Sequence, residues 1–266
     1  MIFSIRRRCT AATTPTTMTT TTMTATTTPT LLLAAVAMVM AAAVIGTTSA
    51  FDPPTYNSTV YEAFFAKVLL NPLPPLTSDP YNDPTINTTL PDFVCAAKYP
   101  DPTNRTNYVL QTYTDPTAAS NDGAYVTHLH PCGYCSSAQD MAVYMQDPNL
   151  TDPVRKCCAL TYISQEESLK CLIKIGFTEN CARIWMYNGI NTRKHCSDLC
   201  LAAWIEGTPS NVPPNSTTLN PCLQCDEDQS GPVFKLIAGR TRRDSGLLSS
   251  INRPPDTIYA VYQYWY

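Results

Sequence analysis

The sequence predicts a mainly α-helical, disulfide-rich protein: a bundle of short helices that follows a proline-rich, largely irregular N-terminal arm and ends in a short strand. Three observations predict this class. Eleven of the 12 cysteines follow residue 50, short segments with helix caps succeed one another between residues 132 and 206, and 12 of the 23 prolines lie between residues 51 and 131. The chain thus divides into a leader (1–50), the arm (51–131) and a cysteine-rich helical domain (132–266).

The leader has the order of a secretory signal, in which basic residues precede a short apolar run and then small residues. Arg6, Arg7 and Arg8 come first, 14 threonines lie within residues 1–30, and residues 31–46 are wholly apolar. A spanning helix needs about 20 apolar residues, and the run over residues 31–46 is shorter, so cleavage after Ala50 is favoured over an uncleaved signal anchor. Such an anchor would be the one contact with a membrane that we expect. Either way, residues 51–266 are secreted or face the outside of a membrane.

Two further features concern the cellular compartment to which the chain is sent. The junction of Ala50 with Phe51 resembles that of two-part plastid presequences, a minority alternative, but Asp52 and Glu62 follow where such transit segments are basic. Five N-x-[ST] sequons predict glycosylated surface positions: Asn57, Asn87, Asn104, Asn149 and Asn215.

One helix is expected in the arm. Thr59 is its predicted N-cap, Glu62 follows three residues on, and Phe64, Phe65 and Leu69 share one face. Asp-Pro pairs begin at residues 79, 83, 101 and 115, and proline biases the preceding residue away from helical backbone. We therefore expect the remainder of the arm to be extended loops draped over the core.

Five short helices are predicted next, because a capping residue opens each segment and glycines end several of them. Helices this short are marginal alone and need cross-links. Their expected spans are residues 137–146, a span that opens at 152, and residues 164–176, 178–189 and 192–206. Short links between them are typical of antiparallel helical hairpins.

The C-terminal part is predicted to add one more helix and a strand. The helix is expected from Pro232 to Ser245, with Gly246 after it. The tail "TIYAVYQYWY", residues 257–266, is β-branched and aromatic without charge, which is typical of a docked strand.

Ten cysteines are predicted to form disulfides that connect these helices, as an oxidising compartment permits. Adjacent Cys157 and Cys158 point about 100° apart on a helix and must have different partners. An eleventh cysteine must be free or pair between chains, and Cys95, alone in the arm, is the candidate, which would allow a disulfide-linked dimer. The ten are Cys132, Cys135, Cys157, Cys158, Cys171, Cys181, Cys196, Cys200, Cys222 and Cys225.

Two other uses of the cysteines remain open. "CGYC", with Cys132 and Cys135, resembles the motif of thioredoxin-fold oxidoreductases, which need a cysteine at a helix N-terminus and a resolving partner one turn later. A βαβ pattern does not follow, and nine more cysteines surround the motif. A zinc site would combine this pair with Cys222 and Cys225, or with His128, His130 and His195.

Two short motifs have alternative interpretations. In "DEDQSG", Asp226, Asp228 and Ser230 resemble the opening of a calcium loop, but Ile237 stands where a bidentate Glu belongs. We favour a cap on the helix that follows. "RTRR", ending at Arg243, matches a proprotein-convertase site, and the alternative is a basic helix end.

Catalysis and nucleic-acid binding are not indicated. The chain has three histidines and lacks the nucleophile-elbow, phosphate-loop and zinc-protease motifs. Residues 51–266 carry 21 acidic and 15 basic side chains, whereas a nucleic-acid partner requires a basic surface. No cofactor is implied.

Four strings resemble a family of cysteine-rich secreted proteins of algae and other microbial eukaryotes: "PCGYCSSAQD", "GFTENCARIWMYN", "CLQCDEDQSGPVF" and "AGRTRRDSGLLSSI", within residues 131–252. The resemblance implies secretion and no assigned activity. We expect a secreted or surface glycoprotein that binds a protein or glycan partner or has a structural role. The alternatives are a thiol-disulfide oxidoreductase and a lipid- or membrane-surface-binding protein, the last marked by an apolar groove among the helices.

Overall fold

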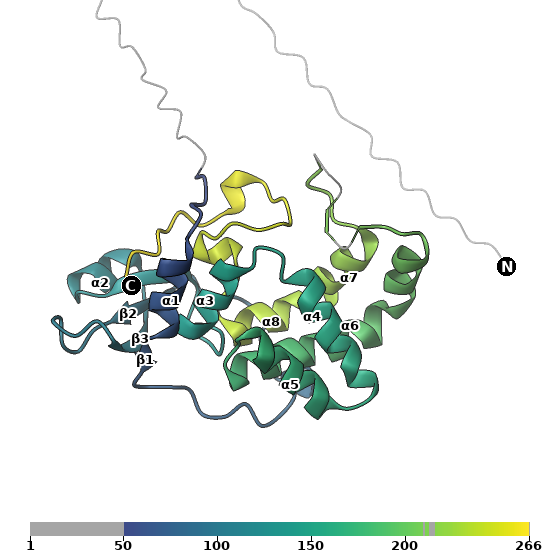
Figure 1. Ribbon diagram of the computed structural model, residues 1–266, viewed down its shortest axis with the longest axis horizontal. Helices are drawn as coiled ribbons and strands as arrows, with labels where there is room; N and C mark the ends of the chain where they lie inside the picture. The colour runs from purple at the N-terminus through teal and green to yellow at the C-terminus, as the bar shows by residue number, and fades with distance from the viewer. Residues whose placement is uncertain (1–50, 210, 213–215, 266) are drawn as a thin grey trace, which may run out of the picture. The chain divides into compact units, whose positions relative to one another are not determined.

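The structure is a computed structural model that describes residues 51–209, 211–212 and 216–265 (Figure 1). The leader, with Ala50 and the apolar run, lies outside the described residues, as does Asn215. In Figure 1 a small sheet with α1 occupies one side of the described part, and α4 to α8 occupy the other.

The arm contains a four-stranded sheet that the sequence did not predict, although most residues of the arm lie outside helices and strands. The strand order is β1-β3-β2-β4, with β2 antiparallel to both neighbours and β1 parallel to β3. The prolines lie outside the strands, which leaves the ladder hydrogen bonds intact. The strands are Val68–Leu69, Val94–Lys98, Asn107–Tyr113 and Tyr125–Leu129.

The predicted arm helix is confirmed as α1, Ser58–Phe65, although its N-cap is Asn57 rather than Thr59. A second helix, α2 (Pro116–Asn121), connects β3 to β4, and Asp115 caps it by accepting a hydrogen bond from the Ala118 N–H. The Asp-Pro pair at residue 115 therefore opens a helix, since proline is well suited to the first helical position.

The helical domain follows the sequence-based expectation for its first three helices, and 3₁₀ turns connect some of its parts. Ser137 and Ser164 cap α3 and α5 as predicted, and α4 begins within one residue of Asp152. The α-helices are α3 Ala138–Gln146, α4 Thr151–Ala159, α5 Gln165–Ile175, α6 Glu179–Ile205, α7 Pro221–Gln229 and α8 Gly231–Ala238.

Helix α6 is continuous over 27 residues, so the predicted break between Gly189 and Thr192 is wrong. Gly189 lies inside the helix because α4 crosses there. A Cβ atom at Gly189 would lie 2.5 Å from the sulfur of Cys158, so only glycine allows this close approach. The glycine is therefore a packing residue rather than a helix end.

Two C-terminal predictions need correction. Helix α8 ends at Ala238, and a separate 3₁₀ turn covers Arg243–Ser245. The tail forms no strand among the described residues, because its backbone makes bonds two residues apart, such as Val261 N–H to Tyr259 O, instead of a ladder. It is nevertheless docked, since Trp265 is buried with its ring 4.6 Å from that of Phe64.

Five disulfides connect the elements, and they correct the prediction for Cys95. Cys95 of β2 is bonded to Cys132, whereas Cys158 has no disulfide partner. The pairs are Cys95–Cys132, Cys135–Cys181, Cys157–Cys171, Cys196–Cys225 and Cys200–Cys222. The last two both join α6 to α7. The proposed dimer through Cys95 therefore loses its basis.

One apolar core runs through both parts of the chain. It includes Phe64 of α1, Met141 of α3, Leu172 of α5 and Ile184 of α6, all fully buried. Because the arm and the helical domain share this core, the sheet is an integral part of the fold. Within the described ranges, every helix is too short or too polar to cross a membrane.

Candidate functional site

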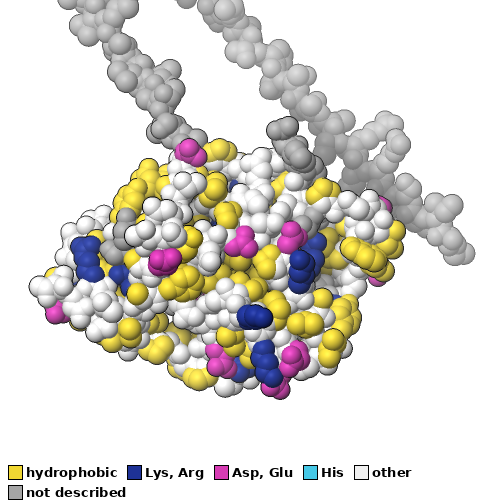
Figure 2. Space-filling view, in the orientation of Figure 1, with side chains coloured by type: hydrophobic (Ala, Val, Ile, Leu, Met, Phe, Trp, Pro, Cys, Tyr) yellow, Lys and Arg dark blue, Asp and Glu magenta, His cyan; other side chains and the backbone are white. Residues whose placement is uncertain are grey.

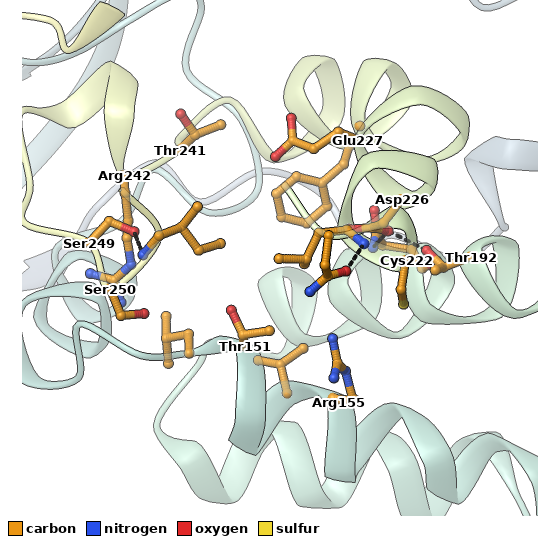
Figure 3. A pocket seen from close by; sticks show the side chains of 18 of the residues that line it. Thr151, Arg155, Thr192, Cys222, Asp226, Glu227, Thr241, Arg242, Ser249 and Ser250 are labelled. Atoms are coloured by element: carbon orange, nitrogen blue, oxygen red, sulfur yellow. Dashed lines mark hydrogen bonds between the residues drawn. The ribbon is translucent and has the colours of Figure 1, made fainter. Parts of the chain in front are cut away.

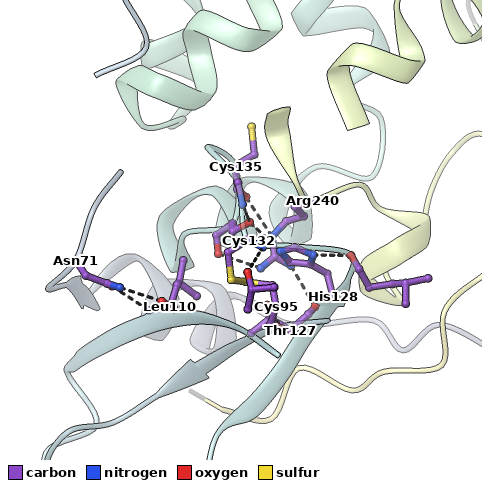
Figure 4. Close-up of a disulfide and its surroundings, with 12 residues drawn as sticks. Asn71, Cys95, Leu110, Thr127, His128, Cys132, Cys135 and Arg240 are labelled. Atoms are coloured by element: carbon purple, nitrogen blue, oxygen red, sulfur yellow. Dashed lines mark hydrogen bonds between the residues drawn. A yellow bond between two sulfur atoms is a disulfide. The ribbon is translucent and has the colours of Figure 1, made fainter. Parts of the chain in front are cut away.

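The "CGYC" cysteines form bonds to different elements, and Figure 4 shows the bond of Cys132 to Cys95. Cys132 is bonded to Cys95 of the sheet and Cys135, which is fully buried, to Cys181 of α6. A redox centre of this type cycles a bond between its own two sulfur atoms, so the observed pairing is that of two structural cross-links. Gly133 lies between them because its backbone packs against Gly239, where a Cβ would meet backbone atoms at 2.6 Å.

The metal alternatives do not match the observed chemistry. Cys132, Cys135, Cys222 and Cys225 are all in disulfides and supply no thiolate for zinc. The residues of the calcium alternative belong to helix α7 and its end, where Asp226 and Ser230 both contact Thr192 but Asp228 lies on another face of the helix.

Their hydrogen bonds show this arrangement. Asp226 accepts from Asn188, Asp228 from Gln224, and the Ser230 hydroxyl contacts Asn191 and Thr192. The predicted cap on the next helix is also wrong, since Ser230 makes no side-chain cap bond there.

The "RTRR" motif is built into the core. Arg240 is fully buried and donates hydrogen bonds to the carbonyls of Thr127, Cys135 and Ser136 and to the Ser245 hydroxyl. Burial lowers the pKa of Arg240 to about 10, so it stays charged at neutral pH. Cleavage after Arg243 would require this segment to unfold locally.

A serine–histidine pair lies beside Arg240, and Figure 4 shows the ring of His128 there. His128 Nε2 is 2.8 Å from the Ser136 hydroxyl, and Nδ1 is 2.7 Å from the Leu129 carbonyl oxygen. Burial holds the pKa of His128 well below its ordinary value. Both side chains are fully buried, so no substrate reaches the pair and it acts as a structural link.

A cavity of about 1430 Å³ lies among the helices of the described part of the chain. Its walls are α4, α6, α7, α8 and the segment 241–258, and Phe51 to Pro53 lie at its edge. Figure 3 shows Thr151 and Arg155 of α4 on one side, Asp226 and Glu227 of α7 across from them, and Arg242, Ser249 and Ser250 at the other end.

Apolar side chains form most of the cavity wall. They come from α4 through Val154, from α6 through Trp185 and from α8 through Phe234. The rings of Trp185 and Phe234 are packed 4.5 Å apart. The α4–α6 crossing at Gly189 and the two α6–α7 disulfides hold these walls in place.

Polar groups gather at the α7 side of the cavity. The carboxylate of Asp226 accepts hydrogen bonds from Thr192 and from Asn188, the latter at 3.1 Å. Burial raises the pKa of Asp226 above its ordinary value, although these hydrogen bonds act against the shift. Glu227 next to it forms ion pairs with Arg253 at 2.6 Å and Lys235 at 3.3 Å.

Three cavity arginines have no carboxylate within ion-pair distance in the described part of the chain: Arg155, Arg193 and Arg242. Arg193 lies over the ring of Tyr162 at 4.4 Å, and Arg242 donates to the backbone carbonyls of Tyr144 and Asp147. The cavity therefore combines apolar walls with arginines that form no ion pair, although Asp226 interacts electrostatically with Arg155 and Asp147 with Arg242.

The free cysteine belongs to the cavity wall. The thiol of Cys158 donates a hydrogen bond to the carbonyl of Trp185 at 3.6 Å. Burial and the nearby Asp226 raise the pKa of Cys158 to about 12. Since the thiolate is the reactive form, this cysteine is a poor nucleophile at neutral pH.

Two polar atoms of cavity-lining side chains lack a hydrogen-bond partner within the described ranges: the hydroxyl of Tyr144 and the indole N–H of Trp185. Both side chains are aromatic neighbours of Phe177. The Trp185 side chain nevertheless lies close enough to the Tyr144 hydroxyl to act on its pKa, so the two polar atoms face each other rather than the open cavity.

The predicted glycosylation sites differ in their surroundings. Asn57, Asn87 and Asn104 are exposed, and each uses its side-chain oxygen to accept a backbone N–H bond. Asn149 is half-buried, and its side-chain nitrogen, the atom to which a glycan attaches, donates to Asp152 at 2.9 Å. Glycan occupancy stays a prediction.

Sequence reasoning missed this cavity as a site. Its polar residues are spread over helices that come together only in the fold, and none forms a local motif. The sequence feature nearest to it is the odd number of cysteines after residue 50, which requires an unpaired thiol but does not identify Cys158.

A family of unknown function (DUF8771) matches residues 165–261, from the start of α5 to the tail. The match includes the α6, α7 and α8 walls of the cavity and leaves out α4. Comparison with curated proteins gave no match, and comparison with solved structures gave none either. The resemblance of the chain to an uncharacterised family is thus supported over this stretch.

Proposed function

We propose that the chain is a secreted, disulfide-stabilised binding protein that holds a lipophilic small molecule in the cavity between α4, α6, α7 and α8. The observation that carries the proposal is the size and lining of this cavity. Pockets for ordinary small molecules measure about 300–1,000 Å³ and are mostly apolar with a few polar groups. A cavity of about 1430 Å³ suits a larger, chain-like ligand.

The wall chemistry favours an amphipathic ligand. Apolar side chains such as Val154 and Phe234 would contact its hydrocarbon part. The polar groups near Arg155 would contact its oxygen atoms. Since the free energy of apolar burial scales with area at about 25 cal/mol per Å², the hydrocarbon would supply most of the affinity.

The five disulfides support an oxidising compartment. They agree with the secretory order of the leader and with the exposed sequons at Asn57, Asn87 and Asn104. Binding is proposed rather than catalysis because Cys158 is held protonated and His128 and Ser136 are enclosed.

The test uses two adjacent alanines of α6. Ala203 lines the cavity, whereas Ala202 is exposed and does not line it. Ala203→Trp should place a ring inside the cavity and weaken binding of cis-parinaric acid, a fluorescent fatty acid, about tenfold or more. Ala202→Trp adds the same ring outside and should bind like the unsubstituted chain.

Both affinities are measured by fluorescence titration of the oxidised protein without detergent or vesicles, and circular dichroism monitors the helices. Equal affinities for the two variants would show that the fatty acid binds elsewhere. An unsubstituted chain that takes up no fatty acid at micromolar concentration would refute the proposed function.

A further inference from the structure

Large apolar side chains are exposed around the cavity mouth, and we call this set the mouth rim. Ile163, Trp204 and Ile205 are 79%, 78% and 71% exposed. The rim comprises Tyr162, Ile163, Leu201, Trp204, Ile205 and Leu248. Four of them, Tyr162, Leu201, Trp204 and Leu248, also line the cavity, so the rim is continuous with its interior.

The rim is organised by helix α6. Leu201, Trp204 and Ile205 are three and four residues apart, which places them on one face of the last turns of the helix. Figure 2 shows hydrophobic side chains gathered over this end of α6, at the right of the view. Contiguous exposed apolar surface of this kind marks a site of interaction with a protein or a membrane.

The charge around the cavity differs from that of the whole exported chain. Six lining side chains are cationic and four are acidic, whereas residues 51–266 carry 15 basic and 21 acidic residues. Arg155 and Arg193, among the lining cations, have no ion-pair partner in the described part. The mouth therefore has local charge complementarity to an anionic surface.

We propose that the mouth rim docks the protein on a lipid bilayer that contains anionic phospholipid, so that the cavity opens toward the membrane. This inference rests on the proposed function, because it identifies the source of the lipophilic ligand. A rim around a hollow suits a fluid surface, which can conform to it, better than a rigid protein face. Trp204 and Tyr162 are of the residue types that prefer the headgroup level of a bilayer.

Docking would remove apolar surface from water on both sides of the mouth. A hydrocarbon chain could then pass from the bilayer into the cavity without crossing bulk water, where its exposure costs about 0.8 kcal/mol per CH₂ group. The exposed Arg155 and the half-buried Arg193 would contact headgroup phosphates.

The test compares two double variants. Ile163→Ser with Ile205→Ser removes rim residues that do not line the cavity, and Leu70→Ser with Leu73→Ser removes exposed leucines elsewhere. Binding to vesicles of phosphatidylcholine with phosphatidylglycerol is measured by flotation. The rim variant should partition about tenfold less than the unsubstituted chain, and the control should match it. Phosphatidylcholine alone should bind more weakly.

A second measurement uses tryptophan emission. Trp204 is exposed while Trp265 is buried, so a shift to shorter wavelength on addition of vesicles would report entry of Trp204 into the bilayer. The Trp204→Phe variant should lose this shift.

The outcomes separate the two proposals. Equal vesicle binding by the rim variant and the control would overturn the docking inference, as would a rim substitution that dissociates a dimer in size-exclusion chromatography. If the unsubstituted chain binds cis-parinaric acid in solution but no vesicles, docking fails and the proposed function stands. If it binds vesicles through the rim but takes up no fatty acid, the proposed function fails instead.

Discussion

Single buried charges hold distant parts of this chain together. Asp140 is fully buried in α3 and accepts hydrogen bonds from the Ser137 hydroxyl at 2.6 Å and the Thr178 N–H at 2.8 Å. Ser137 and Thr178 are the N-caps of α3 and α6. One carboxylate therefore fixes the starts of two helices relative to each other, next to the Cys135–Cys181 disulfide.

Asp140 should make the stability depend on pH. Burial raises its pKa from 3.8 to about 6, so the folded chain binds this proton more tightly than the unfolded chain. The stabilising contribution is then present at acid pH and is lost as the pH rises through about 4 to 6. We compare the free energy of unfolding of the unsubstituted chain with that of Asp140→Asn. The difference, unsubstituted minus variant, should fall by about 2 kcal/mol between pH 4 and pH 7.

Urea denaturation across this range measures the difference. Asp228→Asn, which changes an exposed carboxylate, is the control and should give a nearly constant difference. A constant difference for Asp140→Asn as well would mean that burial does not raise the pKa of Asp140.

Residue-level predictions from the sequence succeeded where the cause was local. The caps at Ser137, Ser164 and Thr178 are confirmed because each bonds to a backbone N–H two or three residues ahead. The roles of Cys95 and Arg240 depend on residues 37 and more than 100 positions away. No local pattern encodes such partners.

At the level of elements, the strands were the hardest to predict. β2 has four buried residues in succession and so lacks the polar alternation of a half-buried strand. It is buried on both faces, between the core and a smaller cluster with Ala119 and Tyr113. The break predicted in α6 was wrong for the opposite reason, because a local signal at Gly189 was overridden by packing against Cys158.

The two disulfides between α6 and α7 should be partly redundant, so that either one alone supplies most of the stabilisation. Either bond closes the connection between the two helices, and the other then adds only a loop of a few residues, since Cys196 and Cys200 lie one turn apart. Loop-closure entropy predicts a small effect for the second bond. Removal of either pair as Cys→Ser should lower the free energy of unfolding by less than about 2 kcal/mol.

Removal of both pairs should then cost more than the two single effects added together. Urea unfolding of the three variants under non-reducing conditions gives these values. Strict additivity would show that the bonds constrain the unfolded chain independently.

At the scale of the whole molecule, the proposed site exists only in the folded chain, because distant segments form its walls. Its wall residues come from segments that begin near Phe51 and continue as far as Ile258. Short amphipathic helices and disulfides were predictable from capping and cysteine spacing, but the space between helices depends on their packing angles. The sequence-based alternative of a lipid-binding protein with an apolar groove stays a prediction, and the sequence did not identify the residues of such a groove.

The number of reactive thiols reports the state of the whole chain. A chain cleaved after Ala50 should carry one free thiol, at Cys158, whereas an uncleaved chain carries Cys9 as well. Maleimide labelling in urea without reductant, followed by intact mass spectrometry, should therefore add one group to the cleaved chain and none to its Cys158→Ser variant.

In the folded protein at pH 7, the same label should react with Cys158 more than about a hundredfold slower than it does in urea. The reason is that the pKa of Cys158 in the folded chain is raised to about 12. Rapid labelling of the native chain would show that the thiol is open to solvent.

The burial of Arg240 has a consequence for a chain that is secreted as proposed. Disulfides form early in the secretory pathway, and the bond at Cys135 closes the loop whose carbonyl receives the Arg240 guanidinium. Convertases that recognise "RTRR" would meet the chain only afterwards. A folded molecule with this disulfide holds Arg240 in its core, so the motif is open to a protease only in a chain whose core has not closed.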